Sequence, residues 1–237
     1  MTNIADNLRR LNAAIHAFAV RYNRDPDAIC LLAASKDQSP GAVATAWREG
    51  VRCCGENYLQ EALPKMAALQ NCAIEWHFIG TIQANKTHAI AAHFAWAHGV
   101  DRMRVAERLS AQRPPGLPPL NICLQVNIDC EPTKAGVTPE QLGKLAVAVA
   151  ALPGVQLRGL MAIPRPTNSL DQARKPYRRL AQLLADLRRL SPSLAGLDTL
   201  SMGMSADLEA AIAEGATIVR IGAALFGPRQ HVPKRSA

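Results

Sequence analysis

The sequence is poor in aromatic residues, which make up 4% of its 237 positions. Proteins that read single-stranded nucleic acids usually stack bases on aromatic side chains, and no recognised nucleic-acid-binding motif accompanies the basic residues here. The net charge of +8 would suit an anionic partner. Much of that excess nevertheless falls at helical spacing and indicates a solvated helix face, formed by Arg174, Lys175, Arg178, Arg179, Arg188 and Arg189. We therefore expect no nucleic-acid partner.

Long apolar runs are also missing. No run approaches the roughly 20 residues that a membrane span needs, and positions 1–10 form a polar helix start with no apolar signal segment behind it. An apolar fraction of 49% with 19% charged residues is ordinary for a globular protein with a full core. These features predict a cytoplasmic protein with no membrane partner.

The cysteines show no metal-binding pattern. None of the six forms a C-x2-C pair or a Cys/His cluster at metal-ligand spacing. Most sit in or beside apolar runs, which favours buried free thiols; they are Cys30, Cys53, Cys54, Cys72, Cys123 and Cys130. From the sequence we expect no metal ion.

What the sequence does contain is a regular alternation of short β-rich runs with helical periodicity. The predicted strands are Ile29–Ala34, Val51–Cys54, Ile74–Ile79, Phe94–Ala97, Ile122–Ile128, Gln156–Ala162, Leu197–Leu200 and Thr217–Ile221. Eight units of about 25 to 30 residues suit a closed (β/α)8 TIM barrel. No G-x-G-x-x-G follows the first strand to favour an open dinucleotide-binding sheet. We predict one domain over residues 1–237, with an extra N-terminal helix within 1–23 and a basic tail at 229–237.

Several helices carry capping signals at their first residues. Such signals occur at Ser39-Pro40, at Thr138-Pro139-Glu140-Gln141 and at Ser205, and glycines at positions 50 and 215 end the first and last of these helices. A further helix after Asn57 must accommodate Pro64. Another covers Ser169–Leu190, and its regular part is expected to begin at Pro176.

Polar residues lie near the C-terminal ends of the first three predicted strands or just after them, and these ends of barrel strands are where active sites lie. Lys36 emerges directly from the first apolar run. Most lysines are solvated, but partial burial would lower the pKa of its amine and free it to attack an aldehyde. Asn57 is either a helix cap, with Gln60 in the capping-box place, or a ligand contact. His77 is either a core histidine with a satisfied hydrogen bond or a functional group.

The last two strands carry the strongest signals. Loops after strands seven and eight of such barrels often bind phosphate, and here they contain the stretch Ser201-Met202-Gly203-Met204-Ser205 and Gly222. Glycines let an oxyanion approach the backbone and hydroxyls donate to it, although a capped helix with a tight turn would look the same. Arg220 interrupts an apolar strand, and a buried guanidinium needs a partner, which is either a carboxylate or a ligand.

Six motifs, taken in order and at these spacings, resemble those of the PLP homeostasis proteins, barrel proteins that bind pyridoxal 5′-phosphate (PLP) and are related to the alanine racemase N-terminal domain. The motifs are Leu31–Lys36, Gly55–Tyr58, Trp76–Gly80 with Gln83, Asn85 and Lys86, Arg158–Ala162, Ser201–Ser205 and Val219–Gly222. The resemblance covers nearly the whole chain. It implies a barrel like that of fold-type III PLP proteins, with PLP as the cofactor.

The resemblance also assigns roles to individual residues. It implies a Schiff base between PLP and Lys36, and further cofactor contacts from Asn57, His77, Met161, Ser201, Gly203, Met204, Ser205, Arg220 and Gly222. Arg220 would face the pyridine nitrogen. Because arginine keeps its proton, that nitrogen would stay unprotonated and the ring would be a poor electron sink. The chain departs from the family at Asp37-Gln38, where a second lysine or a proline often stands, and at Cys54, where phenylalanine is usual.

The function implied is that of a monomeric PLP carrier or regulator without catalytic turnover, with PLP-dependent apo-enzymes as candidate partners. Lys134 and Lys86 are candidates for a second PLP-accepting amine. The alternative is a PLP-dependent amino-acid racemase. Such enzymes need a second acid/base, commonly a tyrosine from a C-terminal β domain. Little beyond the basic tail is expected after the last strand here, and of Tyr22, Tyr58 and Tyr177 only Tyr58 lies near a predicted strand end.

Overall fold

The structure is a computed structural model that describes residues 3–227. Within them, eight parallel strands close into a barrel in chain order, because β1 pairs with both β2 and β8. The strands are β1 Cys30–Ala34, β2 Cys53–Glu56, β3 Glu75–Phe78, β4 Trp96–Val100, β5 Leu120–Gln125, β6 Val155–Met161, β7 Thr199–Ser201 and β8 Ile218–Ile221. The predicted (β/α)8 barrel is confirmed.

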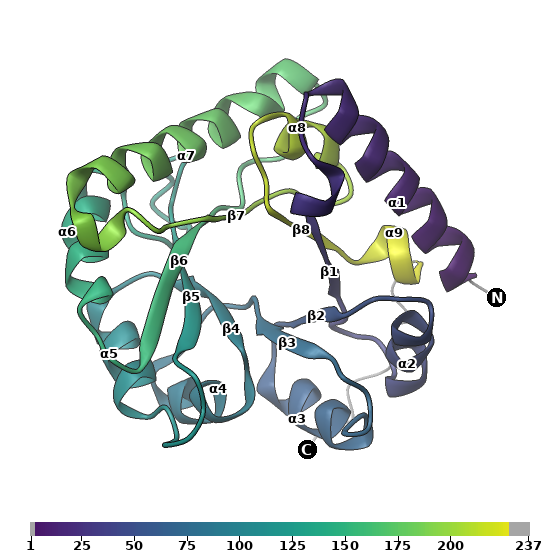
Figure 1. The fold of residues 1–237 in the computed structure, drawn as a ribbon, viewed down its shortest axis with the longest axis horizontal. Helices are drawn as coiled ribbons and strands as arrows, with labels where there is room; N and C mark the ends of the chain where they lie inside the picture. Colours follow the sequence, from purple (N-terminus) through teal and green to yellow (C-terminus); the bar gives the residue numbers. More distant parts are fainter. Residues whose placement is uncertain (1–2, 228–237) are drawn as a thin grey trace.

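Helices surround the strands (Figure 1). They are α1 Ile4–Arg21, α2 Pro40–Arg48, α3 Leu59–Ala68, α4 Thr87–His93, α5 Met103–Ala111, α6 Pro139–Ala150, α7 Leu170–Leu190, α8 Leu208–Ala213 and α9 Ala223–Phe226, with short 3-10 turns at η1 Pro26–Ala28, η2 Ala84–Lys86 and η3 Pro192–Leu194. The extra N-terminal helix is α1, which packs beside α8 and α9 through its buried stripe. The predicted basic tail at 229–237 lies outside the described residues.

The sheet separates an outer core from an inner one. Alternate residues of a strand face opposite sides, and in β8 Val219 and Ile221 join the apolar layer between strands and helices. Ile218 faces the barrel interior together with Leu32 and Trp96. The same alternation directs Arg220 inward. The alternation of side chains along β8 therefore places this charged side chain in the interior of the barrel.

Three helix starts differ from the predictions. Helix α7 begins at Leu170 with Ser169 as its cap, so Pro176 lies inside it. The buried stripe of α7 outweighs the single hydrogen bond that proline removes. Helix α8 begins at Leu208 rather than after Ser205. Helix α3 begins at Leu59, so Asn57 does not cap it.

The cysteines are less uniformly buried than expected. Cys54 and Cys123 are buried, but Cys130 is exposed, which contradicts the prediction for that residue. It lies in the loop after β5 and has a positive φ of 53°. No helix among residues 3–227 is long and apolar enough to cross a membrane.

Candidate cofactor site

Lys36 lies at the C-terminal end of β1, between two strands that also carry predicted site residues. Because β8 and β2 flank β1, Gly222 and Asn57 follow the strands on either side of it. Lys36 itself is half-buried. Gly222 lies so close to β1 that a Cβ atom there would stand 3.3 Å from the carbonyl oxygen of Ala34. The barrel thus gathers three of the predicted residues at one place.

The amide of Asn57 has an unused acceptor. Its Oδ1 atom is buried and has no hydrogen-bond partner among residues 3–227. Leaving a buried acceptor unsatisfied costs about 1 to 3 kcal/mol, so this atom is available to a donor from a ligand or a water molecule. Asn57 does not cap α3, which leaves the ligand contact as the alternative that the sequence proposed.

Arg220 is 6% exposed and has only neutral oxygen partners. One guanidinium nitrogen donates to the Ser201 carbonyl oxygen at 2.6 Å and to Ser201 Oγ at 2.9 Å, and the other donates to the Ala162 carbonyl oxygen at 3.0 Å. Burial lowers the pKa of Arg220, although that pKa starts far above neutrality. None of the ion pairs within the described chain includes this residue, so the carboxylate alternative is wrong. A rigidly held positive charge therefore stands inside the barrel.

The two loops predicted to bind phosphate lie next to this arginine. Gly203 has a φ of +93°, a conformation that favours glycine, and the Met204 N–H donates to Asp207 Oδ1 at 2.6 Å. Helix α9 starts directly after Gly222, so its first amide groups have no partner within the helix. Met204 is half-buried and Ser205 is exposed. The glycines and free amides suit an oxyanion.

Ser201 and Met161 are neighbours in register on β7 and β6. Both are buried. The Ser201 hydroxyl points into the barrel, where it contacts His98 Nδ1 at 2.7 Å as well as Arg220. Its clearest role in the structure is to hold Arg220, and a direct phosphate contact from it remains a prediction.

A buried ion pair behind Lys36 was missed at the sequence level. Lys65 Nζ, from α3, donates to Glu56 Oε1 at 2.6 Å and to the Ser35 carbonyl oxygen at 2.7 Å, and Ser35 Oγ donates to the same carboxylate at 2.6 Å. Burial raises the pKa of Glu56, while Lys65 and Ser35 oppose that rise. The pair fixes the backbone immediately before Lys36. The available signal was spacing, since Leu59, Ala62 and Lys65 lie on one buried face of α3.

His77 is part of a hydrogen-bonded chain through the barrel interior. Its Nε2 lies 2.9 Å from Glu75 Oε1, and its Nδ1 lies 2.9 Å from His98 Nε2. Since His98 contacts Ser201 and Ser201 contacts Arg220, the chain runs from the N-terminal end of β3 to the cofactor site. Both ring nitrogens of His77 thus have protein partners, and its predicted contact with the cofactor remains untested.

Comparisons with known proteins identify the family. The family described as alanine racemase, N-terminal domain, matches residues 3–230. The pyridoxal phosphate homeostasis protein of Pseudomonas aeruginosa is 54% identical over 231 residues, 98% of each chain. That of Escherichia coli K12 is 46% identical over 237 residues, 99% of this chain and 100% of that protein. The solved structure of PipY from Synechococcus elongatus with PLP bound has a TM-score of 0.84 and 34% identity, over 95% of this chain and 100% of that one.

The class defined by fold and site is therefore the PLP-binding barrel. The chain belongs to the alanine racemase N-terminal domain family and, within it, to the pyridoxal phosphate homeostasis proteins. The resemblance predicted from the six motifs is confirmed. The residues described above also fit the cofactor, because they supply an amine, a fixed cation, an unsatisfied amide oxygen and glycine-lined loops.

Proposed function

We propose that this protein binds PLP covalently through Lys36 and serves PLP homeostasis, as its relatives are named for doing. One observation carries the proposal: the buried Arg220 guanidinium has no carboxylate partner in the described chain and stands on the strand next to the one that ends at Lys36. A permanent cation held in this way suits a ligand with an acceptor ring nitrogen.

Each residue has a distinct part in holding the cofactor. PLP supplies an aldehyde that reacts reversibly with amines. Lys36 offers that amine from a half-buried position, and Arg220 offers fixed donors to the ring nitrogen. Gly203, Ser205 and Gly222 line the loops for the phosphate, while Asn57 presents its unpaired amide oxygen. Because arginine keeps its proton, the ring nitrogen opposite Arg220 would stay unprotonated, which would make the ring a weaker electron sink.

The tyrosines also support a carrier rather than a racemase. A racemase needs a second acid/base on the other face of the cofactor. Tyr22 donates to Glu209 at 3.0 Å and Tyr177 donates to Asp207 at 2.7 Å, so both hydroxyls are engaged elsewhere. Tyr58 is 55% exposed on the surface. Two of the three tyrosine hydroxyls are therefore engaged with carboxylates and the third side chain is exposed, which supports the carrier over the racemase.

The test is the visible absorbance of the purified protein before and after borohydride reduction, followed by peptide mass mapping. The proposal predicts a band that disappears on reduction and a pyridoxyl adduct on Lys36. No band after PLP is added, or an adduct confined to another lysine, would contradict it. Incubation with L-alanine should give no D-alanine; turnover that is lost in Lys36→Ala would establish a racemase instead.

We further propose that the protein acts as a cytoplasmic monomer and passes PLP to apo-enzymes. A PLP-dependent apo-enzyme should regain activity faster with the loaded protein than with free PLP at the concentration the carrier releases by itself. Equal rates would mean that the protein stores PLP without delivering it directly.

A further inference from the structure

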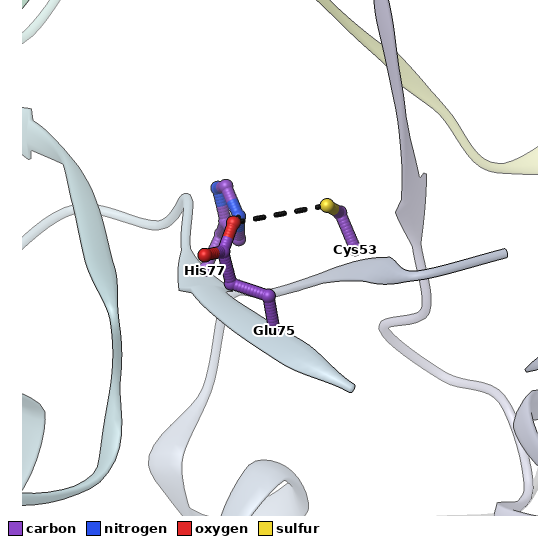
Figure 2. A group of neighbouring side chains, drawn as sticks. All are labelled: Cys53, Glu75 and His77. Carbon is purple, nitrogen blue, oxygen red and sulfur yellow. Dashed lines mark hydrogen bonds and ion pairs between the residues drawn. The ribbon is translucent and has the colours of Figure 1, made fainter. Parts of the chain in front are cut away.

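Three side chains at the N-terminal end of the barrel present metal-binding atoms to one another (Figure 2). Cys53 and Glu75 are the first residues of β2 and β3, and His77 lies two positions further along β3. The Glu75 carboxylate lies 2.9 Å from His77 Nε2 and 3.8 Å from Cys53 Sγ. All three ligand atoms lie within 4.8 Å of one another.

These separations approach those around a tetrahedral zinc ion. Zinc bonds of about 2.0 to 2.3 Å place neighbouring ligand atoms about 3.3 to 3.6 Å apart, so side-chain shifts of about 1 Å would seat the ion. We propose that Cys53, Glu75 and His77 form a binding site for a divalent ion of the zinc class. A thiolate with an imidazole selects such an ion over Mg²⁺ or Ca²⁺, which prefer oxygen ligands alone.

The neighbours of His77 fix the orientation of its ring, as is usual for a histidine that binds a metal. A ligating histidine typically donates its other ring N–H to a neighbour that fixes the orientation of the ring. Here His77 Nδ1 lies 2.9 Å from His98 Nε2, and the His77 ring stacks on Trp96 with centroids 5.3 Å apart. His98 Nε2 accepts that proton in the tautomer whose Nδ1–H is directed to Ser201 Oγ, 2.7 Å away. The His77 ring is therefore already oriented to bind an ion through Nε2.

Solvent access and charge balance also suit an ion. The Glu75 side chain is 48% exposed, and Cys53 is half-buried, so an ion can arrive from solvent. Binding would displace the proton of the Cys53 thiol and leave His77 neutral. One thiolate and one carboxylate then offset the two charges of the ion. Water from solvent is available as a fourth ligand.

The test is a Co²⁺ titration of the full-length protein, free of PLP, kept reduced and treated with a chelator beforehand. We expect one Co²⁺ per chain, a thiolate-to-cobalt charge-transfer absorption, and displacement of the cobalt by Zn²⁺. Cys53→Ser should lose that absorption. Glu75→Gln, at a half-exposed position, should bind about tenfold more weakly or worse, since loss of a supporting group alone has an effect of that size. The exposed Cys130→Ser is the matched control and should behave as wild type.

Several outcomes would overturn the proposal. They are no charge-transfer absorption in the wild type, its persistence in Cys53→Ser, or unchanged affinity in Glu75→Gln. Circular dichroism of each variant shows whether the fold is intact, and Glu75→Gln remains informative if Cys53→Ser does not fold. Because the protein contains no PLP in this experiment, the result does not depend on the proposed role of Lys36.

Discussion

The two ends of this barrel differ in how their polar groups are satisfied. At the C-terminal end, the Asn57 amide oxygen has no partner among the described residues, and Arg220 has only neutral ones. At the N-terminal end, the Arg158 guanidinium pairs with Asp198 and lies 5.1 Å from the centroid of the Trp96 ring, so its charge has a carboxylate partner within the described chain. The contrast shows where an organic ligand fits.

The interior chain from Glu75 to Arg220 joins the two ends. It contains two buried histidines, of which His98 has a pKa well below its usual value because it is buried and lies near His77 and Arg220. His98 is therefore neutral near pH 7, and it links His77 to Ser201 through hydrogen bonds.

The largest expected effect is at Lys36. Lys36→Ala removes the only amine that the proposal uses, so the reducible absorbance band should disappear completely. The matched control is Lys144→Ala, at an exposed position on α6, which should retain the band in full. A band of normal intensity in Lys36→Ala would place the covalent bond elsewhere.

The next largest effect concerns the buried pair behind Lys36. Lys65 is 4% exposed and Glu56 is fully buried, so Lys65→Met leaves an unpaired buried carboxylate. The free energy of unfolding should fall by about 3 to 5 kcal/mol in denaturant titrations. The double variant Glu56→Gln/Lys65→Met should lose less than Lys65→Met alone. An equal or greater loss would show that the pair is not the source of the effect.

A direct comparison of the two ends uses their arginines. Arg220→Lys keeps the charge but loses part of the hydrogen bonding to Ser201 and Ala162, so PLP should dissociate about tenfold more readily, equivalent to roughly 1.4 kcal/mol. Arg158→Lys makes the same chemical change at the N-terminal end and should leave PLP retention unchanged. Equilibrium dialysis of the two variants measures both. Similar losses in both would remove the distinction between the ends.

The smallest effect is a pH dependence at the N-terminal end in metal-free protein. The hydrogen bond with His77 lowers the pKa of Glu75, so its contribution to stability is present above the ordinary value of 4.5 and is lost as pH falls. Burial opposes the charge on His77, but hydrogen bonds with Cys53 and Glu75 raise its pKa overall. The contribution of protonated His77 to stability is present below its ordinary pKa of 6.5 and is lost as the pH rises through the raised pKa.

The pair should therefore stabilise the fold most between these two values. Glu75→Gln should lower the free energy of unfolding by at most about 1 kcal/mol near pH 5.5, because the carboxylate is half-exposed. The loss should shrink at about pH 9. A loss that stays constant over this range would mean that the ion pair does not form.

Which residues of the two sites could be predicted from the sequence depends on how far apart their contacts lie along the chain. The positions of Lys36 and Gly222 at the C-terminal ends of strands were predictable from the barrel, and that of Arg220 because a charge interrupts an apolar strand, whereas their roles toward the cofactor stay predictions. Lys65 and His98 were not, since their roles depend on contacts with residues of other strands. Cys53 and Glu75 stand 22 positions apart and come together only through the pairing of β2 with β3.

The most direct test of the account is a crystal structure of the protein grown with PLP. It should show density continuous from Lys36 Nζ to the cofactor, with the ring nitrogen facing Arg220 and the phosphate between the loops that contain Gly203 and Gly222. PLP joined to another lysine, or a ring nitrogen that faces away from Arg220, would contradict the assignment of the C-terminal end as the cofactor site.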